Sequence, residues 1–222
     1  MLAAASQAFA DILTPPFRSV LLKSLALTIG LLVVIWLGLQ GASVYFIDVT
    51  TYPWVETILV ILTGIGFFIG LGFLVAPITS LLAGLFADEV AEVVERTHYP
   101  DDPPGRALPF GEQLVTTLKF TGVVILGNLV ALLLLLVPGV NIAAFFVVNG
   151  YLLGREYFEG AAMRFRTPEE ARTLRKRHAG TVFVAGLLIA LVLAVPILNL
   201  VTPLFATAFM AHLNKRLSAR PA

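Results

Sequence analysis

The sequence predicts an all-α integral membrane protein. Three observations lead to this fold class: the composition, the lengths of the uncharged runs, and two proline-containing turns that nearly repeat each other. Of the 222 residues, 58 % are hydrophobic and 13 % are charged, and the mean hydropathy is +0.91. A water-soluble domain of this size does not bury so much apolar surface. We expect one membrane domain over residues 1–222, with two long transmembrane helices, two re-entrant (half-penetrating) helical hairpins and short amphipathic helices.

Residues 1–13 predict an amphipathic segment at the membrane surface. Leu2, Phe9 and Ile12 share one face of a short helix, and Asp11 lies elsewhere on it. No basic residue precedes the apolar part, so the segment lacks the pattern of a cleaved signal peptide. We expect the mature protein to begin with this segment.

Two long uncharged runs predict the transmembrane helices, over residues 15–47 and 57–87. The first helix begins at Thr14-Pro15-Pro16, where threonine is a capping residue and proline removes only N–H groups that lack partners in a first turn. Ser24–Ile47 then provides 24 residues without a charge, which is enough to cross a bilayer. The second run is 31 residues long, and Pro77 is expected to kink or divide it.

Residues 120–158 and 181–213 each predict a helical hairpin that enters the membrane and returns. Their turns, Val137–Ile142 and Val195–Leu200, each contain proline and asparagine and no charge. The four apolar arms are 12 or 15 residues long, which is shorter than the about 20 residues that cross a bilayer. The arms are Val123–Val137, Ile142–Leu153, Thr181–Val195 and Ile197–Ala211.

The uncharged tips of the hairpins are expected to lie within the membrane. Unpaired backbone groups at that depth cost several kcal/mol each, so neighbouring helices or bound water must shield the tips. Two ordinary pairs of spanning helices joined by tight turns are the alternative.

The charges predict the orientation of the chain. Residues 88–119 form a cytoplasmic polar region with seven acids against three bases, and residues 159–180 form a basic cytoplasmic segment. With two spanning helices and two hairpins, all 15 Lys and Arg side chains fall on one face. The positive-inside rule places that face and both termini in the cytoplasm. A six-span arrangement gives the same sidedness.

No pattern in the sequence predicts an enzyme. The chain has no cysteine, and it lacks the zinc-protease, serine-hydrolase and phosphate-loop motifs. We therefore expect no catalytic residue, no bound metal and no cofactor. Spaced glycines such as Gly66 and Gly70 allow close approach of helices and are not preceded by a strand. The basic stretch Arg172–His178 is expected to meet lipid headgroups and not nucleic acid.

Arg18 is the candidate anion-binding residue. It follows Thr14-Pro15-Pro16-Phe17 at the start of the first predicted span. A helix N-terminus presents unpaired N–H groups and about half a positive charge, and a guanidinium adds planar donors suited to a tetrahedral oxyanion. Lys23 lies five residues on, near the same membrane level. The alternative is that both cations are topological anchors that extend to the headgroups.

A second group of residues is the candidate pathway: Lys119, Asn141, Arg155, Glu156 and Asn199. Arg155 and Glu156 lie where the first hairpin returns to the surface, and Lys119 precedes that hairpin. Asn141 and Asn199 lie at the two tips. The alternatives are an interfacial ion pair at Arg155 and amides that only hydrogen-bond to neighbouring helices.

Three motifs in register, the first in two parts, resemble the CysZ-type bacterial sulfate transporters, over residues 8–216. They are Val75-Ala76-Pro77-Ile78, Leu81-Leu82-Ala83, Val137-Pro138-Gly139-Val140 and Pro196-Ile197-Leu198-Asn199-Leu200. The resemblance implies a multi-pass protein of the bacterial inner membrane that takes up sulfate for cysteine synthesis and assembles as a homo-oligomer. It also implies two long spanning helices with half-penetrating hairpins.

Members of that family carry a Gly-Leu/Ile-Arg sulfate-binding motif at the start of the first long helix, often followed by a second arginine. The matching positions here are Pro16-Phe17-Arg18, followed by Ser19. The arginine is kept, whereas the glycine and the second arginine are not. The missing glycine limits how closely sulfate approaches the backbone, and the missing arginine removes one cation. The resemblance therefore implies a substrate-binding set of Phe17, Arg18, Ser19 and Lys23.

The function predicted from these features is sulfate uptake into the cytoplasm without ATP hydrolysis. Sulfite and related oxyanions are further candidate substrates, and membrane lipids are the expected surroundings. The alternative is a non-transporting membrane scaffold or assembly factor whose basic face recruits a cytoplasmic partner.

Overall fold

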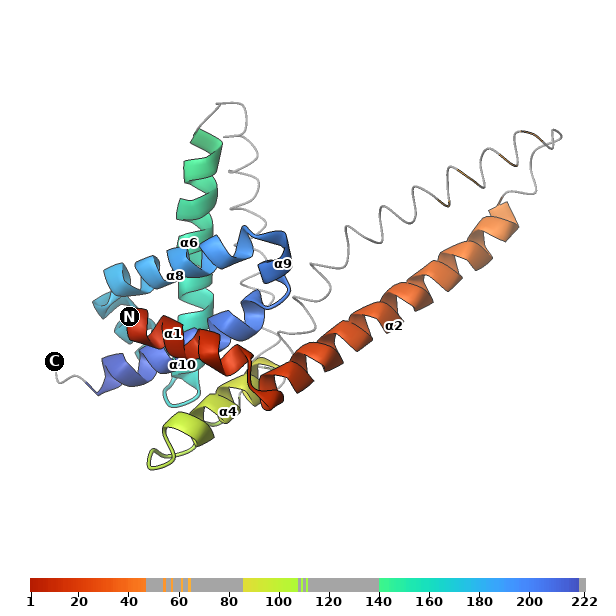
Figure 1. The fold of residues 1–222 in the computed structure, drawn as a ribbon. Helices are drawn as coiled ribbons and strands as arrows, with labels where there is room; N and C mark the ends of the chain where they lie inside the picture. The colour runs from red at the N-terminus through yellow and green to blue at the C-terminus, as the bar shows by residue number, and fades with distance from the viewer. Residues whose placement is uncertain are drawn as a thin grey trace. The chain divides into compact units, whose positions relative to one another are not determined.

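The computed structural model describes residues 1–46, 54, 57, 61, 64, 86–107, 109, 111 and 140–219 (Figure 1). These residues form α-helices and their connections, with no strand among them, as the predicted fold class requires. The chain divides into two units, one of Met1–Arg18 with Phe86–Ala222 and one of Ser19–Leu85. The predicted helix over 57–87 and the first arm of the first hairpin lie outside the described residues, apart from single positions and the last two residues of that helix.

Helix α1 (Leu2–Ile12) is the predicted amphipathic segment. Leu2 and Phe9 are exposed large apolar side chains, as a surface segment in a membrane requires. The opposite face buries Ala4, Ala8 and, against expectation, Asp11. Figure 1 shows α1 beside α10, and the Phe9 and Phe205 rings lie 4.3 Å apart across that contact.

Helix α2 (Pro15–Phe46) matches the helix predicted over residues 15–47. Within the described residues, its stretch Pro15–Gly38 is the one straight helix long and apolar enough to cross a membrane. A narrow stripe of α2 is buried, at Val20, Ser24, Thr28 and Leu32. Elsewhere the helix exposes large apolar side chains, which are Leu22, Leu27, Ile29, Leu31, Val33, Val34, Trp36 and Leu37. An exposed apolar face of this extent is typical of a helix surrounded by lipid.

Helix α6 (Val140–Met163) is longer than the predicted second arm of the first hairpin, Ile142–Leu153. Its 24 residues include the apolar arm and ten further residues, 154–163, which make almost three more turns. The predicted end was wrong because charged residues continue the helix: Arg155 and Glu159 lie one turn apart, with 3.7 Å between Nε and Oε1. Charge marks the end of the apolar stretch here and not the end of the helix.

The segment predicted as the second hairpin contains helices joined by a broken turn. Helix α8 (Ala179–Leu193) is the first arm, and the second arm consists of the short helix α9 (Pro196–Asn199) and α10 (Thr202–Ser218). The single predicted arm Ile197–Ala211 is wrong in this respect. Pro203, in the first turn of α10, has no N–H to continue α9, so the helix restarts there.

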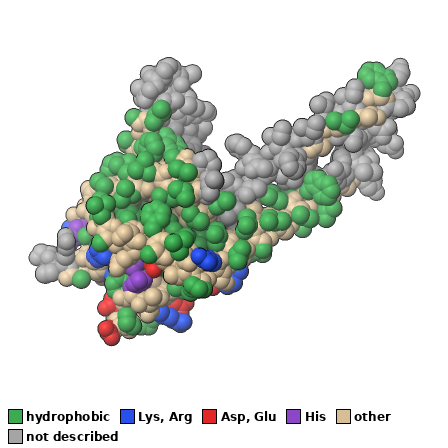
Figure 2. Space-filling model, in the orientation of Figure 1, with side chains coloured by type: hydrophobic (Ala, Val, Ile, Leu, Met, Phe, Trp, Pro, Cys, Tyr) green, Lys and Arg blue, Asp and Glu red, His purple; other side chains and the backbone are tan. Residues whose placement is uncertain are grey.

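The polar segments form two further helices, α4 (Ala87–His98) and α7 (Pro168–Arg177). At the start of α7, the Glu170 amide donates to the Thr167 hydroxyl at 3.3 Å, and the Thr167 amide donates to the Glu170 carboxylate at 2.9 Å. The Thr167 amide and hydroxyl hold the pKa of Glu170 below its ordinary value. Helices α7 and α8 then meet at His178 with a bend of 92°. The visible acidic and basic side chains of the first unit gather toward one end in Figure 2, where α4 lies.

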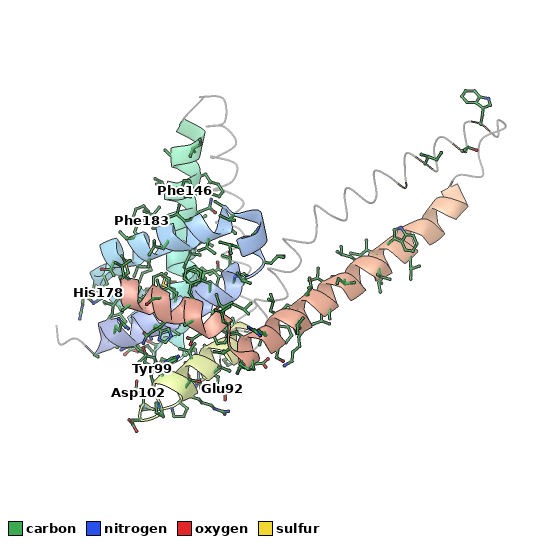
Figure 3. The ribbon with its side chains drawn as sticks, in the orientation of Figure 1. Glu92, Tyr99, Asp102, Phe146, His178 and Phe183 are labelled. Carbon is green, nitrogen blue, oxygen red and sulfur yellow. The ribbon has the colours of Figure 1, made fainter. Side chains whose placement is uncertain are left out.

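Glycines bring α6 and α8 into backbone contact. Gly150 and Gly154 lie four residues apart on α6, and Gly186 faces both from α8. A Cβ on Gly186 would meet the Gly150 carbonyl oxygen and lie 2.7 Å from the Gly154 nitrogen. Small residues at this spacing permit the close packing found between membrane helices. Phe146 and Phe183, labelled in Figure 3, lie on these two helices.

A buried ion-pair network fixes the loop after α4. Arg164 donates from Nε and Nη2 to the two Glu95 oxygens, at 2.7 and 3.1 Å, and from Nη1 to Asp88 at 2.6 Å. Arg164 and Glu95 are each 6 % exposed. The Gly105 amide donates to Glu95 at 3.1 Å, and the Arg106 amide donates to the Arg164 carbonyl at 2.8 Å. The network therefore ties the end of α6 to both sides of the loop.

Candidate functional site

The candidate substrate site begins at the first turn of α2. The Arg18 amide donates to the Thr14 carbonyl at 3.1 Å, which places Thr14 at the backbone N-cap position. The first two helical residues, Pro15 and Pro16, carry no N–H. Of the first three helical positions, Phe17 alone therefore offers a backbone donor that lacks an acceptor within the helix. The dense set of amide donors expected of a helix start is reduced here to one.

Thr14 holds the turn between α1 and α2 instead of capping α2 with its side chain. Its hydroxyl donates to the Asp11 carbonyl at 2.6 Å, and its amide donates to the same oxygen at 2.9 Å. The expected side-chain cap at this position is therefore wrong. The hydroxyl is used to close the end of α1, because the prolines leave it one N–H at most to accept from.

Arg18 presents its side chain on the surface of the first turn. It is exposed, and it forms no ion pair with any residue that the structure describes. Phe17, by contrast, is 2 % exposed, so its side chain is packed and contributes at most its amide. An exposed guanidinium beside one free amide is able to hold an oxyanion by charge and by two-pronged hydrogen bonds.

Ser19 and Lys23 are exposed on the next turns of α2. They are four residues apart and share a side of the helix, whereas Arg18 and Lys23 are five apart, or about 140° around it. The residues predicted as one binding set therefore lie on two different sides of α2. Of the two cations, Arg18 lies nearer the start of α2, and it has no ion-pair partner among the described residues.

The candidate pathway residues lie on other elements. Arg155 lies on α6 with its Nε 3.7 Å from Glu159, which also accepts from Arg175 Nε at 2.6 Å, so the predicted alternative of an ion pair applies. Glu156, the next residue on α6, is half-buried. Asn141 lies in the first turn of α6, and Lys119 is outside the described residues.

Asn199 carries an unusual feature for a side chain at a hairpin tip. Its Oδ1 atom is buried and has no hydrogen-bond partner among the described residues, while its backbone N–H donates to the Val195 carbonyl at 2.8 Å. A buried acceptor without a partner costs about 1–3 kcal/mol. A water molecule is the usual partner for a buried polar atom of this kind.

Comparison with known proteins identifies the family. Residues 4–203 match the sequence profile of the family described as sulfate transporter CysZ/etoposide-induced protein 2.4. The chain belongs to this family. The resemblance predicted from the three motifs is thereby confirmed. No individual protein among the curated proteins compared matches the chain.

Membership of the CysZ/etoposide-induced protein 2.4 family fits the structure at a coarse level. The family description names a transporter and no enzyme. Helix α2 is long and apolar and exposes large hydrophobic side chains, as a membrane-spanning helix does. Sequence reasoning missed two charged groups that the structure assembles from distant segments. One is the Arg164 network, and the other is a cluster of Asp11, His98 and His212.

Proposed function

We propose that this protein moves sulfate across the bacterial inner membrane into the cytoplasm, without ATP hydrolysis, and so supplies cysteine biosynthesis. The family membership supports sulfate as the substrate. The single observation that carries the site is Arg18, an exposed cation at the start of the one clear membrane-crossing helix, with no ion-pair partner among the described residues. The chain acts as a homo-oligomer with both termini in the cytoplasm.

Sulfate binds first at Arg18 and then passes the hairpin tips. The Arg18 guanidinium and the Phe17 amide hold two of its oxygens, and Lys23, on another side of α2, adds only to the positive charge of this region. Asn199, with its unpaired buried oxygen, supports a polar route at the second tip. Asn141 and Lys119 are assigned to the same route from their places in the sequence.

Replacing Arg18 by alanine is expected to lower the uptake of labelled sulfate into proteoliposomes by about 10- to 100-fold. Hydrogen bonds to a charged group contribute about 1.5–3 kcal/mol, which corresponds to that range. Arg172→Ala, which removes an exposed arginine of α7, is the matched control and keeps its flux. Arg18→Lys keeps the charge but loses the planar pair of donors, and should retain part of the flux.

A thermal-shift measurement in detergent separates binding from transport. Sulfate, but not chloride, is expected to raise the melting temperature of the wild type and of Arg172→Ala, and to have no effect on Arg18→Ala. Equal flux and equal sulfate shifts in all three proteins would eliminate Arg18 as the site. Absence of flux in the wild type, together with recovery of a stable cytoplasmic partner, would favour the scaffold function instead.

A further inference from the structure

We propose that Asp11, His98 and His212 form a binding site for a divalent transition metal, with Zn²⁺ the ion that fits their donors. The three residues come from α1, from the last residue of α4 and from α10, and all belong to the same compact unit. Each offers one ligand atom, and the three atoms lie within 4.8 Å of one another. The inference is independent of sulfate transport.

One carboxylate joins two imidazoles in this cluster. His98 Nε2 lies 2.8 Å from Asp11 Oδ1, and His212 Nε2 lies 3.0 Å from Asp11 Oδ2. Two histidine nitrogens and a carboxylate are a ligand set of catalytic zinc sites, whereas Mg²⁺ and Ca²⁺ prefer oxygen ligands. Metal binding would displace the protons that these hydrogen bonds now share.

The separations require little movement to admit an ion. Bonds of about 2.0–2.2 Å in a tetrahedral site place neighbouring ligand atoms about 3.3 Å apart. The 2.8 Å and 3.0 Å contacts to Asp11 would therefore open by about 0.5 and about 0.3 Å, and the two histidine nitrogens, which lie within 4.8 Å of each other, would take the same spacing. Tyr99 is placed to orient one ligand: its hydroxyl lies 2.9 Å from His212 Nδ1, the nitrogen left free when Nε2 binds metal. Figure 3 labels Tyr99 at the end of α4.

The site has a dry side and an open side. His212 is fully buried and Asp11 is 6 % exposed, so two ligands are held rigidly by the packing of α1 against α10. The His98 side chain is 28 % exposed, which leaves a route for the ion and space for a water molecule as the fourth ligand. Arg216 adds a positive charge nearby, but Gln7 engages its guanidinium at 2.6 Å.

A bound ion would secure α1 at the point where it leads into α2. The side chain of Asp11 lies in the cluster, while its carbonyl oxygen accepts the hydroxyl and the amide of Thr14. The same residue therefore belongs both to the metal site and to the turn that precedes Arg18.

The first test measures zinc content in the full chain, purified in detergent without a polyhistidine tag. After treatment with a chelator and dialysis against Zn²⁺, the wild type is expected to retain one Zn²⁺ per chain, and none is retained in dialysis against Mg²⁺. His98→Gln and Asp11→Asn should lose the ion, and Tyr99→Phe should bind it about 10- to 100-fold more weakly. His178→Gln, at the junction of α7 and α8, is the matched control and keeps it. Equal zinc content in the wild type and His98→Gln would overturn the proposal.

The second test uses a spectrum and does not depend on loss of binding. The chain contains no cysteine, so in His98→Cys any thiolate-to-cobalt charge-transfer band must come from residue 98. His98 is the most exposed of the three ligands, and the variant is expected to fold. Addition of Co²⁺ should produce that band, and Asp11→Asn in the same background should remove it. A folded His98→Cys protein that shows no band would contradict the site.

Discussion

Replacing Gly186 by alanine is expected to separate α6 from α8 and to lower the melting temperature of the protein in detergent by several degrees. The added methyl group would meet backbone atoms, the Gly150 carbonyl oxygen and the Gly154 nitrogen, which cannot rotate away as a flexible side chain does. Overpacking typically costs about 1–3 kcal/mol, and 1 kcal/mol corresponds to about 2–4 °C in a chain of this size.

Gly160→Ala is the matched control for this crossing. Gly160 lies on α6, and a Cβ there would have no neighbour within 4 Å among the atoms described. Since alanine favours a helix over glycine by about 1 kcal/mol, this variant should be as stable as the wild type or slightly more stable. Equal melting temperatures for Gly186→Ala and Gly160→Ala would show that the two helices do not approach this closely.

Replacing Arg164 by methionine is expected to destabilise the first unit by about 3–5 kcal/mol, the usual cost of leaving a buried charge without its partner. Among the described residues, Glu95 would keep the Gly105 amide alone as a partner for its buried carboxylate, and Asp88 would lose its contact at 2.6 Å. Limited proteolysis of the loop after α4, together with thermal unfolding in detergent, measures the effect.

Two further variants show whether burial is the cause. Arg96→Ala removes an exposed ion pair with Glu92 on the same helix and should cost no more than about 0.5 kcal/mol. Adding Glu95→Gln to Arg164→Met replaces the unpaired Glu95 carboxylate by a neutral amide. The double variant should therefore recover part of the lost stability. A loss in Arg164→Met no larger than in Arg96→Ala would mean that the network is solvated.

The elements that local signals define were predictable from the sequence. The two prolines and the uncharged run after them predicted the start of α2 at Pro15, and the uncharged turn at Val195–Leu200 predicted the break between α8 and α9. The end of α6 was predicted less accurately. The predicted hairpin ends at residue 158, whereas α6 continues to Met163, where pairing between Arg155 and Glu159 supports the longer helix.

The long-range features were not predictable in the same way. Gly150 and Gly154 carry a packing signal in their spacing that was overlooked in favour of glycines in the 57–87 run. Asp11 was assigned to the polar side of a surface helix, because its two histidine partners lie 87 and 201 residues away in the sequence. No local pattern reveals that such residues meet. The candidate site at Arg18 came from the family resemblance and from one helix start, and its division between two sides of α2 required the structure.

The two prolines at the start of α2 affect how an anion is held there. Backbone amides have fixed directions, so several of them together replace the water around a bound anion at fixed positions. Such a set of donors binds best an anion of one particular radius. With one such amide available, an oxyanion beside Arg18 would retain most of its hydration shell and would be held chiefly by charge. A contact of this kind favours rapid capture and rapid release over tight discrimination among tetrahedral dianions of similar radius.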